Sequence, residues 1–294
     1  DLHLLSRRQR QMCIRDRSKN HENLLDCEFK VFICKESWQK MIPKIIHYCW
    51  FGRGEKSKTI KKCLRSWEKK CKDFKTIEWN EDNFNIESHP FVKAAYEDKN
   101  WAFVSDYVRL YALNLYGGIY MDTDVQLVKP IDGFLENEAF LGFENKNNVA
   151  NGLIFGIEKG HWFTQKLLAD YDSILYVAND VNFRMKNTNT ERATKILVDM
   201  GLKLNNQFQI INGIAVYPSE YFCPLDVNTF LMHKTKNTVS IHWYEGAWTS
   251  ARYKEWKRRQ IRRNRIDKVR CLPQRMLRKF LGDSTVDRLK SKIK

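Results

Sequence analysis

The chain has 294 residues, of which 43% are hydrophobic, and a formal net charge of +16. This length can bury one large core, and the apolar content excludes an intrinsically disordered chain. No run approaches the roughly eighteen apolar residues of a transmembrane helix, and the first forty residues lack the apolar core of a secretory signal. The eight cysteines include no C-x-x-C pair, which argues against a zinc site or a disulfide framework and indicates reduced thiols in a cytoplasm.

The positive charge lies at the two ends of the chain. Residues 251–294 hold 17 Lys and Arg against 4 Asp and Glu, residues 1–41 hold 9 against 6, and residues 42–250 hold 25 against 25. We therefore predict a neutral main domain over residues 41–250 and a separate basic tail over residues 251–294.

The opening residues 1–40 differ in character from the rest of the chain. They are polar and rich in arginine, and their phrase QMCIRDRS resembles translated sequencing-adapter read-through. We expect this leader to be extraneous or disordered, with Met41 as the natural start. The alternative that residues 24–40 form a genuine strand or helix stays open.

From Met41 onward, short apolar runs alternate with segments of helical periodicity. This alternation predicts an α/β fold with a mainly parallel sheet that is covered by helices on both faces. The expected strands are 45–51, 75–79, 119–121, 125–128, 140–143, 152–157 and 210–216, and the expected helices are 60–71, 91–96, 101–116, 162–176 and 190–202, the last with Thr190 as N-cap.

Two carboxylates follow the expected strand 119–121. In an extended segment side chains two positions apart face the same way, so Asp122 and Asp124 are expected side by side at the strand's C-terminal end. Ligands of open α/β sheets bind at that edge, and two oxygen ligands there suit a divalent cation that also binds phosphates. A solvated turn is the alternative explanation for an isolated Asp-x-Asp.

The helix before this strand is apolar except for Asp106 and Arg109, which are three positions apart and share one face. Charges inside an apolar helix need a partner or a ligand. They could form an ion pair at the edge of the core, line a site, or do both.

The segment 101–125 resembles the signature of the DXD-containing sugar transferases. These are GT32-type glycosyltransferases of capsular and surface polysaccharide synthesis, with yeast mannosyltransferases and clostridial glucosylating toxins as more distant relatives. The resemblance extends from about Met41 to about Trp248. The matching positions are Ala102, Ser105, Asp106, Arg109, Leu113, Gly117, Gly118, Tyr120, Asp122 and Asp124.

This resemblance implies a GT-A-type, Rossmann-like fold and a retaining transfer of sugar from a UDP- or GDP-sugar to a glycan or lipid-linked glycan. It implies that Asp124 binds Mn²⁺ or Mg²⁺ and that Asp122 shares the metal or contacts the ribose. Asp106 and Arg109 would hold the sugar hydroxyls. The ribose-phosphate region would be contacted by Ser105 and Tyr120.

Three further segments resemble parts of the family's donor site. Trp50, at the end of the first strand, matches a tryptophan that stacks on the donor's base, and Asn151-Gly152 matches a step beside the transferred sugar. His242 matches a residue near the metal or diphosphate, and Trp248 matches one at the leaving oxygen. Ala247 replaces the usual serine, which leaves the third metal ligand open.

Each of these residues also has a purely structural explanation. A tryptophan at a strand end is often a core residue, Asn-Gly is by default a turn, and a histidine in an aromatic strand is most often packed and hydrogen-bonded.

The tail 251–294 combines basic residues with apolar faces, for example Met276, Leu277, Phe280 and Leu281. Such helices bind anionic membrane surfaces, which suits an enzyme peripheral on the inner face of a membrane that extends a lipid-linked glycan. The alternative is a helix that packs its apolar stripe on the domain. No nucleic-acid reading motif accompanies the charges, so we expect no nucleic-acid partner.

Two other functions compete with sugar transfer. A metal-dependent phosphohydrolase could use the same two aspartates and would need a second carboxylate or histidine cluster. A non-enzymatic basic protein that binds membranes or nucleic acids would not need the aspartates.

Overall fold

The computed structural model describes residues 41–178, 180, 183, 188–246, 251–270, 278 and 281–291. The chain divides into two units, Asp1–Met41 and Ile42–Lys294, and all the described helices and strands belong to the second. The predicted leader 1–40, Ala247 and Trp248 lie outside the described residues.

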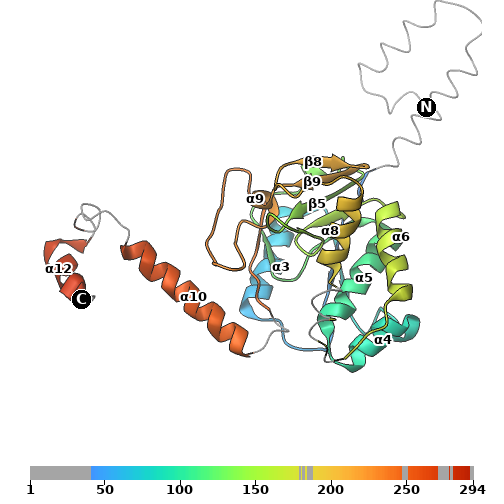
Figure 1. The fold of residues 1–294 in the computed structure, drawn as a ribbon, viewed down its shortest axis with the longest axis horizontal. Coiled ribbons are helices and arrows are strands. Elements are labelled where there is room, and N and C mark those ends of the chain that lie inside the picture. The colour runs from blue at the N-terminus through green and yellow to red at the C-terminus, as the bar shows by residue number, and fades with distance from the viewer. Residues whose placement is uncertain are drawn as a thin grey trace, which may run out of the picture. The chain divides into compact units, whose positions relative to one another are not determined.

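The second unit is built around an eight-stranded sheet with the order β2-β1-β3-β7-β5-β9-β8, in which β6 also pairs with β5 (Figure 1). A separate two-stranded sheet joins β4 to β10. The strands are β1 (Ile45–Cys49), β2 (Lys75–Trp79), β3 (Gly118–Tyr120), β4 (Val125–Leu127), β5 (Ala139–Phe143), β6 (Val149–Ala150), β7 (Phe155–Ile157), β8 (Gln209–Ile211), β9 (Ile214–Tyr217) and β10 (Ser240–His242).

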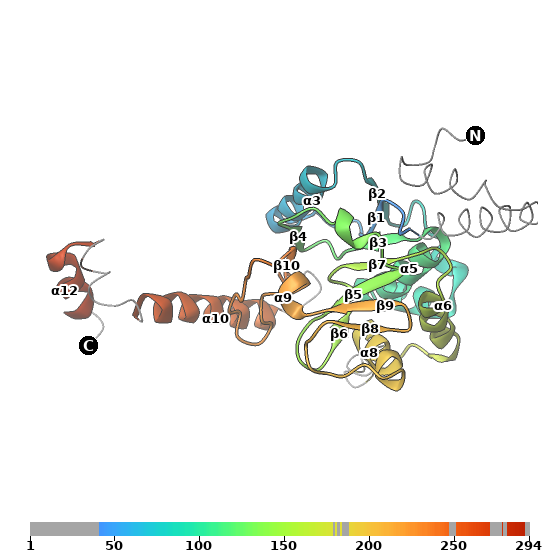
Figure 2. The same ribbon diagram turned by 90° about the horizontal axis from the view of Figure 1, so that it is seen from above.

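Helices cover both faces of the large sheet, with α5 and α6 on one side and α3 on the other (Figure 2). The helices are α3 (Lys58–Lys70), α4 (Pro90–Glu97), α5 (Trp101–Tyr116), α6 (Trp162–Ala169), α8 (Asn189–Asp199), α9 (Ser219–Phe222), α10 (Ala251–Arg270) and α12 (Asp283–Ser291). Short 3-10 turns span Ile86–Ser88, Asp132–Phe134 and Asp170–Ser173. None of the described helices has the length and apolar character needed to span a bilayer.

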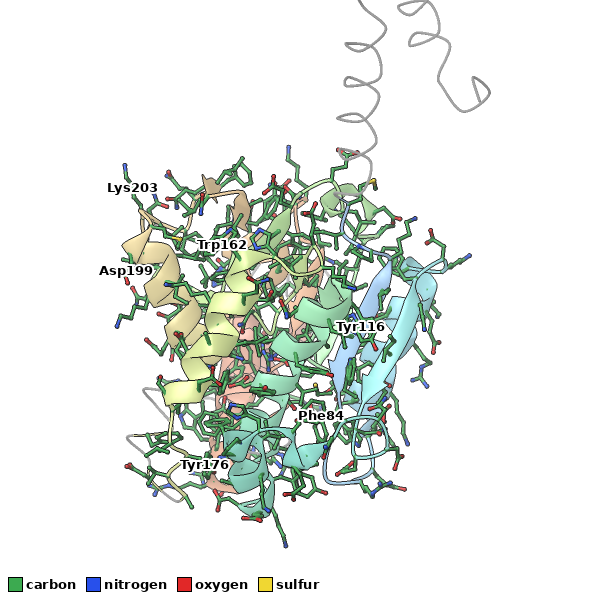
Figure 3. The ribbon with its side chains drawn as sticks, turned by 90° about the vertical axis from the view of Figure 1, so that its right-hand side faces the viewer. Phe84, Tyr116, Trp162, Tyr176, Asp199 and Lys203 are labelled. Carbon is green, nitrogen blue, oxygen red and sulfur yellow. The ribbon has the colours of Figure 1, made fainter. Side chains whose placement is uncertain are left out.

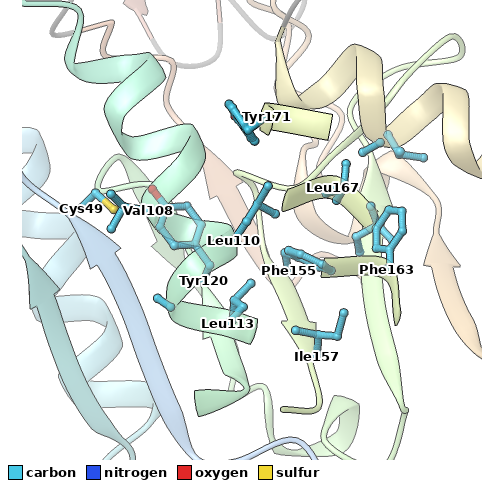
Figure 4. Close-up of a cluster of buried hydrophobic side chains, with 14 of the residues drawn as sticks. Cys49, Val108, Leu110, Leu113, Tyr120, Phe155, Ile157, Phe163, Leu167 and Tyr171 are labelled. Atoms are coloured by element: carbon cyan, nitrogen blue, oxygen red, sulfur yellow. The ribbon is translucent and has the colours of Figure 1, made fainter. Parts of the chain in front are cut away.

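Two cores lie on the two faces of the sheet because successive strand side chains alternate in direction. In β5, Phe140 belongs to the core under α3, whereas Leu141 belongs to the core under α5 and α6. Figure 4 shows the second core, where Leu110 and Leu113 of α5 pack near Phe155 of β7. This packing fixes α5, the helix that carries Asp106 and Arg109.

The predicted α/β class and the flanking helices are confirmed. The sheet is parallel where β2, β1 and β3 adjoin, and again between β5 and β9. Strand β7 enters between β3 and β5 antiparallel to both, and β8 and β6 also pair antiparallel with their neighbours. The half that carries the predicted site is therefore the parallel half.

Three local predictions were wrong. Segment 210–216 is a hairpin of β8 and β9 rather than one strand, because Asn212 and Gly213 both adopt positive φ, as a two-residue hairpin turn requires. The N-cap of α8 is Thr188, whose side chain accepts a hydrogen bond from the Glu191 amide, not Thr190. Finally, the helix expected over 162–176 ends at Ala169 and continues as a 3-10 turn.

His47 sits fully buried in β1 between two hydrogen-bond partners. Its Nε2 lies 2.9 Å from the Gly117 carbonyl oxygen, and its Nδ1 lies 3.1 Å from the indole nitrogen of Trp79. The carbonyl needs a donor and the indole N–H needs an acceptor, so the neutral imidazole satisfies both. The ring of Tyr116, at the end of α5 (Figure 3), stacks beside it. Burial lowers the pKa of His47 to about 4.

We therefore predict a loss of stability in acid that depends on His47. Between pH 6.5 and about 4 the unfolded chain binds a proton that the folded chain excludes, so the free energy of unfolding should fall as the pH falls. The full difference is about 3 kcal/mol. Urea unfolding of wild type and His47→Gln across this range measures it. The variant should show a shallower pH dependence, and equal slopes for the two proteins would contradict the assignment.

Candidate functional site

The predicted site lies at the C-terminal edge of the parallel strands. Strands β1 and β3 are adjacent and parallel, with His47 opposite Tyr120. Trp50 immediately follows β1 and Asp122 follows β3, so both leave the sheet at the same edge. Open α/β sheets bind ligands in the crevice at this edge.

The Asp122-Thr123-Asp124 segment is a turn. The Val125 amide donates to the Asp122 carbonyl oxygen at 3.0 Å, which closes the turn between β3 and β4. The expectation of an extended segment with both carboxylates on one side was therefore wrong. Instead, each carboxylate has its own set of partners.

Asp122 belongs to a cluster around the buried side chain of Arg109, in which the Asp122 carboxylate stays partly exposed. The Arg109 Nη2 atom lies 2.9 Å from Asp106 Oδ1 and 3.2 Å from Asp122 Oδ1. The guanidinium also lies over the ring of Tyr120, whose hydroxyl donates to Asp122 Oδ1 at 3.0 Å. The structure thus brings four of the predicted site residues together, and the pair predicted within α5 extends to a third residue.

Burial controls the electrostatics of this cluster. Burial alone would lower the pKa of Arg109, but the carboxylates of Asp122 and Asp106 raise it, so the guanidinium stays charged. Burial raises the pKa of Asp106, and the neighbouring Arg109 only partly opposes this effect. Two carboxylates share one desolvated cation, which leaves acceptor capacity for a ligand with hydroxyl groups.

Asn151 and Gly152 adjoin the cluster. Asn151 is fully buried, with its Oδ1 3.5 Å from Arg109 Nη1, and its Nδ2 has no hydrogen-bond partner among the described residues. The Gly152 carbonyl accepts from the Asp122 amide at 2.8 Å. A Cβ at Gly152 would overlap Asp122 Oδ2, so only glycine leaves room for that carboxylate. A buried amide without an acceptor is a natural contact for a bound hydroxyl group.

Asp124 is held by the strand β10 and the loop after it. His242 Nε2 lies 3.0 Å from Asp124 Oδ1, and the Glu245 amide donates to Oδ2 at 2.7 Å. Burial alone would raise the pKa of Asp124, but His242 lowers it; Asp124 in turn holds the pKa of His242 well above its usual value, against the effect of burial. The two side chains therefore form a buried ion pair.

The predicted metal set of Asp122, Asp124 and His242 is not assembled. Residues 41–246, apart from their undescribed gaps, and the described tail contain no group of three or more His, Cys, Asp or Glu side chains placed around a metal. His242 directs its Nε2 at Asp124 Oδ1, so in this structure that nitrogen is engaged by the carboxylate. The aspartates still fit an ion that takes one or two carboxylates and completes its shell with phosphate oxygens and water.

Trp50 and Ser105 each have contacts near the end of β1 or within α5. Trp50 is half-buried, its indole N–H donates to the Gly54 carbonyl oxygen at 2.8 Å, and the Lys56 ammonium lies 5.2 Å from its ring centre. The Ser105 carbonyl oxygen lies 3.4 Å from Arg109 Nε. Ser105 thus borders the cluster, whereas the Trp50 ring packs against the core on the α3 side of the sheet. Trp248 lies outside the described residues.

Two further residues adjoin the cluster without having been predicted. Cys49 is buried beside Arg109 and Tyr120, and burial raises the pKa of its thiol to about 12, so it is a neutral packing group. Asn189, buried at the start of α8, donates through Nδ2 to the Asp106 carbonyl oxygen at 2.6 Å. No local sequence pattern predicts either residue, because each contact joins elements that are far apart in the sequence.

Comparison with known proteins supports the resemblance found in the sequence. Residues 57–141 match the model of the glycosyltransferase sugar-binding region containing the DXD motif. This range includes Asp106, Arg109, Asp122 and Asp124. The resemblance to DXD-containing sugar transferases is thereby confirmed.

Two curated fungal proteins are similar to this chain. The mannosyl phosphorylinositol ceramide synthase SUR1 of Saccharomyces cerevisiae is 26% identical over 148 residues, which cover 47% of this chain and 37% of the relative. The inositol phosphoceramide mannosyltransferase 3 of Schizosaccharomyces pombe is 28% identical over 130 residues, or 42% of this chain and 35% of the relative. The chain thus spans little more than a third of the length of these relatives.

Two solved structures are also similar. The PaToxG glycosyltransferase superposes with a TM-score of 0.42 at 16% identity, over 59% of this chain and 76% of that one. A glycosyltransferase involved in glycosylation of the major capsid of PBCV-1 gives 0.39 at 13%, over 71% and 95%. At these TM-scores neither likeness extends to the activity of this chain.

We predict that Arg109→Met destabilises the protein strongly. The substitution keeps most of the side-chain volume but leaves the largely buried carboxylate of Asp106 and the partly exposed carboxylate of Asp122 without their cation. Loss of one partner of a buried charge pair costs about 3–5 kcal/mol. Urea unfolding measures the change, with Arg65→Met on the exposed side of α3 as the control, for which we expect less than about 0.5 kcal/mol. Equal stabilities for the two variants would contradict the charge-sharing role.

Proposed function

We propose that this chain, which carries the sugar-binding region of DXD-containing glycosyltransferases, is a retaining hexosyltransferase that uses a nucleotide sugar. Its donor is a UDP- or GDP-sugar and its acceptor is a glycan or lipid-linked glycan. The observation that carries the proposal is the cluster of Asp106 and Asp122 around the buried Arg109 at the sheet edge, beside the amide nitrogen of Asn151, which has no partner among the described residues.

The cluster has the chemistry that a sugar ring requires. Each sugar hydroxyl can donate a hydrogen bond to a carboxylate and accept one from a guanidinium or amide. Asp106 and Arg109 are rigidly held in α5, so their groups are already oriented before the donor binds. Such preorganisation lowers the cost of fixing the sugar in a reactive orientation.

Asp122 and Asp124 would hold a divalent cation, Mn²⁺ or Mg²⁺. When bound, the ion neutralises the donor's diphosphate and the charge that develops on the leaving oxygen. The chain's own contribution is to fix the two carboxylates: Tyr120 and Arg109 orient Asp122, and His242 and the Glu245 amide orient Asp124. Partners that orient metal-binding carboxylates in this way tune both affinity and activity.

We propose that the base of the donor stacks on the indole of Trp50. Its half-buried indole lies at the same sheet edge as the cluster, and stacking of a base on an aromatic ring contributes about 1–3 kcal/mol. We assign the ribose and phosphates to the region of Ser105 and Tyr120, which border the sugar-binding cluster from α5 and β3.

The basic character of the C-terminal tail supports the proposal that the acceptor lies at a membrane surface. Helix α10 carries ten Lys and Arg against two acidic residues, and Arg259, Arg262 and Arg263 are exposed together with Ile266. The fungal relatives are named for reactions on inositol phosphoceramide, which is a lipid. We propose that α10 holds this enzyme peripherally on the cytoplasmic face of a membrane, where it extends a lipid-linked glycan in capsular or surface polysaccharide synthesis.

Donor hydrolysis tests the proposed activity without knowledge of the acceptor. Slow release of sugar from a panel of UDP- and GDP-sugars should require Mn²⁺ or Mg²⁺ and should stop after chelation. Asp122→Asn and Asp124→Asn should each lower the rate at least about 100-fold, because each removes a charge that would bind the cation. The Arg65→Met protein serves as the control. Unchanged turnover in both aspartate variants, or release of inorganic phosphate with no sugar released, would contradict sugar transfer.

Vesicle sedimentation tests the membrane proposal. Wild type should bind vesicles that contain phosphatidylglycerol, less so at high salt, and should not bind pure phosphatidylcholine. Each basic residue near the surface contributes about 1 kcal/mol, so Arg262→Glu with Arg263→Glu should weaken binding at least about tenfold. The same reversals at Lys69 and Lys70, exposed on α3, are the control. Equal binding of both double variants, or preference for duplex DNA over vesicles, would contradict this role of α10.

A further inference from the structure

Helix α10 contacts the loop that holds Asp124. The Lys257 Nζ atom of this helix donates to the carbonyl oxygens of Trp243 and Tyr244, at 2.9 and 2.5 Å. The Lys257 side chain is half-buried, unlike the exposed arginines on the opposite side of the helix. A half-buried ammonium that binds two carbonyl groups makes charge-assisted hydrogen bonds, which are stronger than neutral ones.

The same loop encloses Asp124 from two sides. The Trp243 amide donates to the Asp124 carbonyl oxygen at 3.1 Å, and the Glu245 amide donates to Asp124 Oδ2 at 2.7 Å. Between them Tyr244 has a φ of 49°, a left-handed conformation that a tyrosine adopts only when its surroundings impose it. The loop therefore needs an external support in order to present the Glu245 amide to Asp124.

Lys257 supplies that support at the position where the backbone is strained. Its two acceptors are the carbonyl groups on either side of the Tyr244 Cα, so the ammonium fixes both peptide planes that meet there. The second of these planes also contains the Glu245 amide nitrogen. A chain of contacts thus connects the ammonium, the Tyr244–Glu245 peptide and the Asp124 carboxylate.

We propose that Lys257 is a positioning residue of the active site, which acts through residues 243–245 to fix the carboxylate of Asp124. The proposal rests on the proposed function, in which Asp124 binds the cation and the donor diphosphate. In this assignment the basic helix has two distinct faces. One exposes arginines to a membrane, and the other completes the catalytic domain.

Helix α10 has other contacts with the domain, so loss of Lys257 alone should not release it. The rings of Trp256 and Phe230 lie 5.7 Å apart, and Asn264 Nδ2 donates to the Thr229 carbonyl oxygen at 2.5 Å. A substitution at Lys257 can therefore relax the loop while the helix stays in place. This separation makes the proposal testable by a single substitution.

The test compares Lys257→Met, Lys257→Arg and Arg258→Met in the full-length chain without vesicles. Arg258→Met removes the same charge from the adjacent, exposed position of α10. Hydrogen exchange followed by mass spectrometry reports on the amides of residues 243–246. Donor hydrolysis as a function of donor and Mn²⁺ concentration gives kcat, KM and the Mn²⁺ requirement.

We expect Lys257→Met to speed amide exchange in residues 243–246, to lower kcat roughly 10- to 100-fold and to raise the Mn²⁺ requirement, with a smaller change in KM for the donor. Lys257→Arg should restore part of kcat, and Arg258→Met should match wild type in both measurements. Wild-type exchange or wild-type kcat in Lys257→Met would overturn the assignment. If wild type itself releases no sugar from any donor, the proposed function fails instead, and the exchange measurement still decides whether Lys257 orders the loop.

Discussion

The ion pairs that the buried guanidinium of Arg109 forms with Asp106 and Asp122 are the interaction on which the rest of the site depends. A desolvated cation is tolerated only beside counter-charges, and here two carboxylates from different elements supply them, Asp106 from α5 and Asp122 from the turn after β3. The charge therefore ties the helix to the sheet edge. The three charged side chains also keep hydrogen-bonding capacity that water or the hydroxyl groups of a ligand can use.

Several features of the fold allow this charge sharing. The glycine at position 152 leaves room for Asp122, and its carbonyl oxygen holds the Asp122 backbone. The ring of Tyr120 covers the guanidinium from the strand side. The two hydrophobic cores fix the position of α5 relative to β3. The packing of the apolar side chains therefore determines where the charged side chains lie.

The turn at Asp122–Asp124 divides the site into two parts. Asp122 faces the cluster in α5, whereas Asp124 faces His242 and the loop that Lys257 supports. The first part has the donors and acceptors that suit a sugar, and the second has a carboxylate held by an ion pair. A donor that spans both parts would connect the core of the domain with its basic C-terminal helix.

The sequence was sufficient to predict the elements whose signals are local. Helix 101–116 and strand 75–79 were predicted with the bounds that the structure shows, because helical periodicity and the glycines at 117 and 118 fix the first and a short apolar alternation fixes the second. The hairpin 209–217 was missed because the turn signal of Asn212-Gly213 lies inside one apolar run.

The site was predicted less completely than the fold. The resemblance identified Asp106, Arg109, Asp122 and Asp124, but the assumption of an extended Asp-x-Asp segment gave the wrong relation between the two aspartates. His242 pairs directly with Asp124, and the contributions of Cys49, Asn189 and Lys257 depend on contacts between elements far apart in sequence. Neither hydrophobic periodicity nor motif spacing in the sequence can predict such long-range contacts.

A crystal structure of the protein with a UDP- or GDP-sugar and Mn²⁺ would test the central claim most directly, since the anomalous signal of manganese locates the ion independently of the donor. The account predicts an anomalous peak on the carboxylate of Asp124 or Asp122, with the sugar hydroxyls bonded to Asp106, Arg109 and Asn151. A donor bound elsewhere, with the Arg109 cluster unchanged and free of sugar contacts, would contradict it.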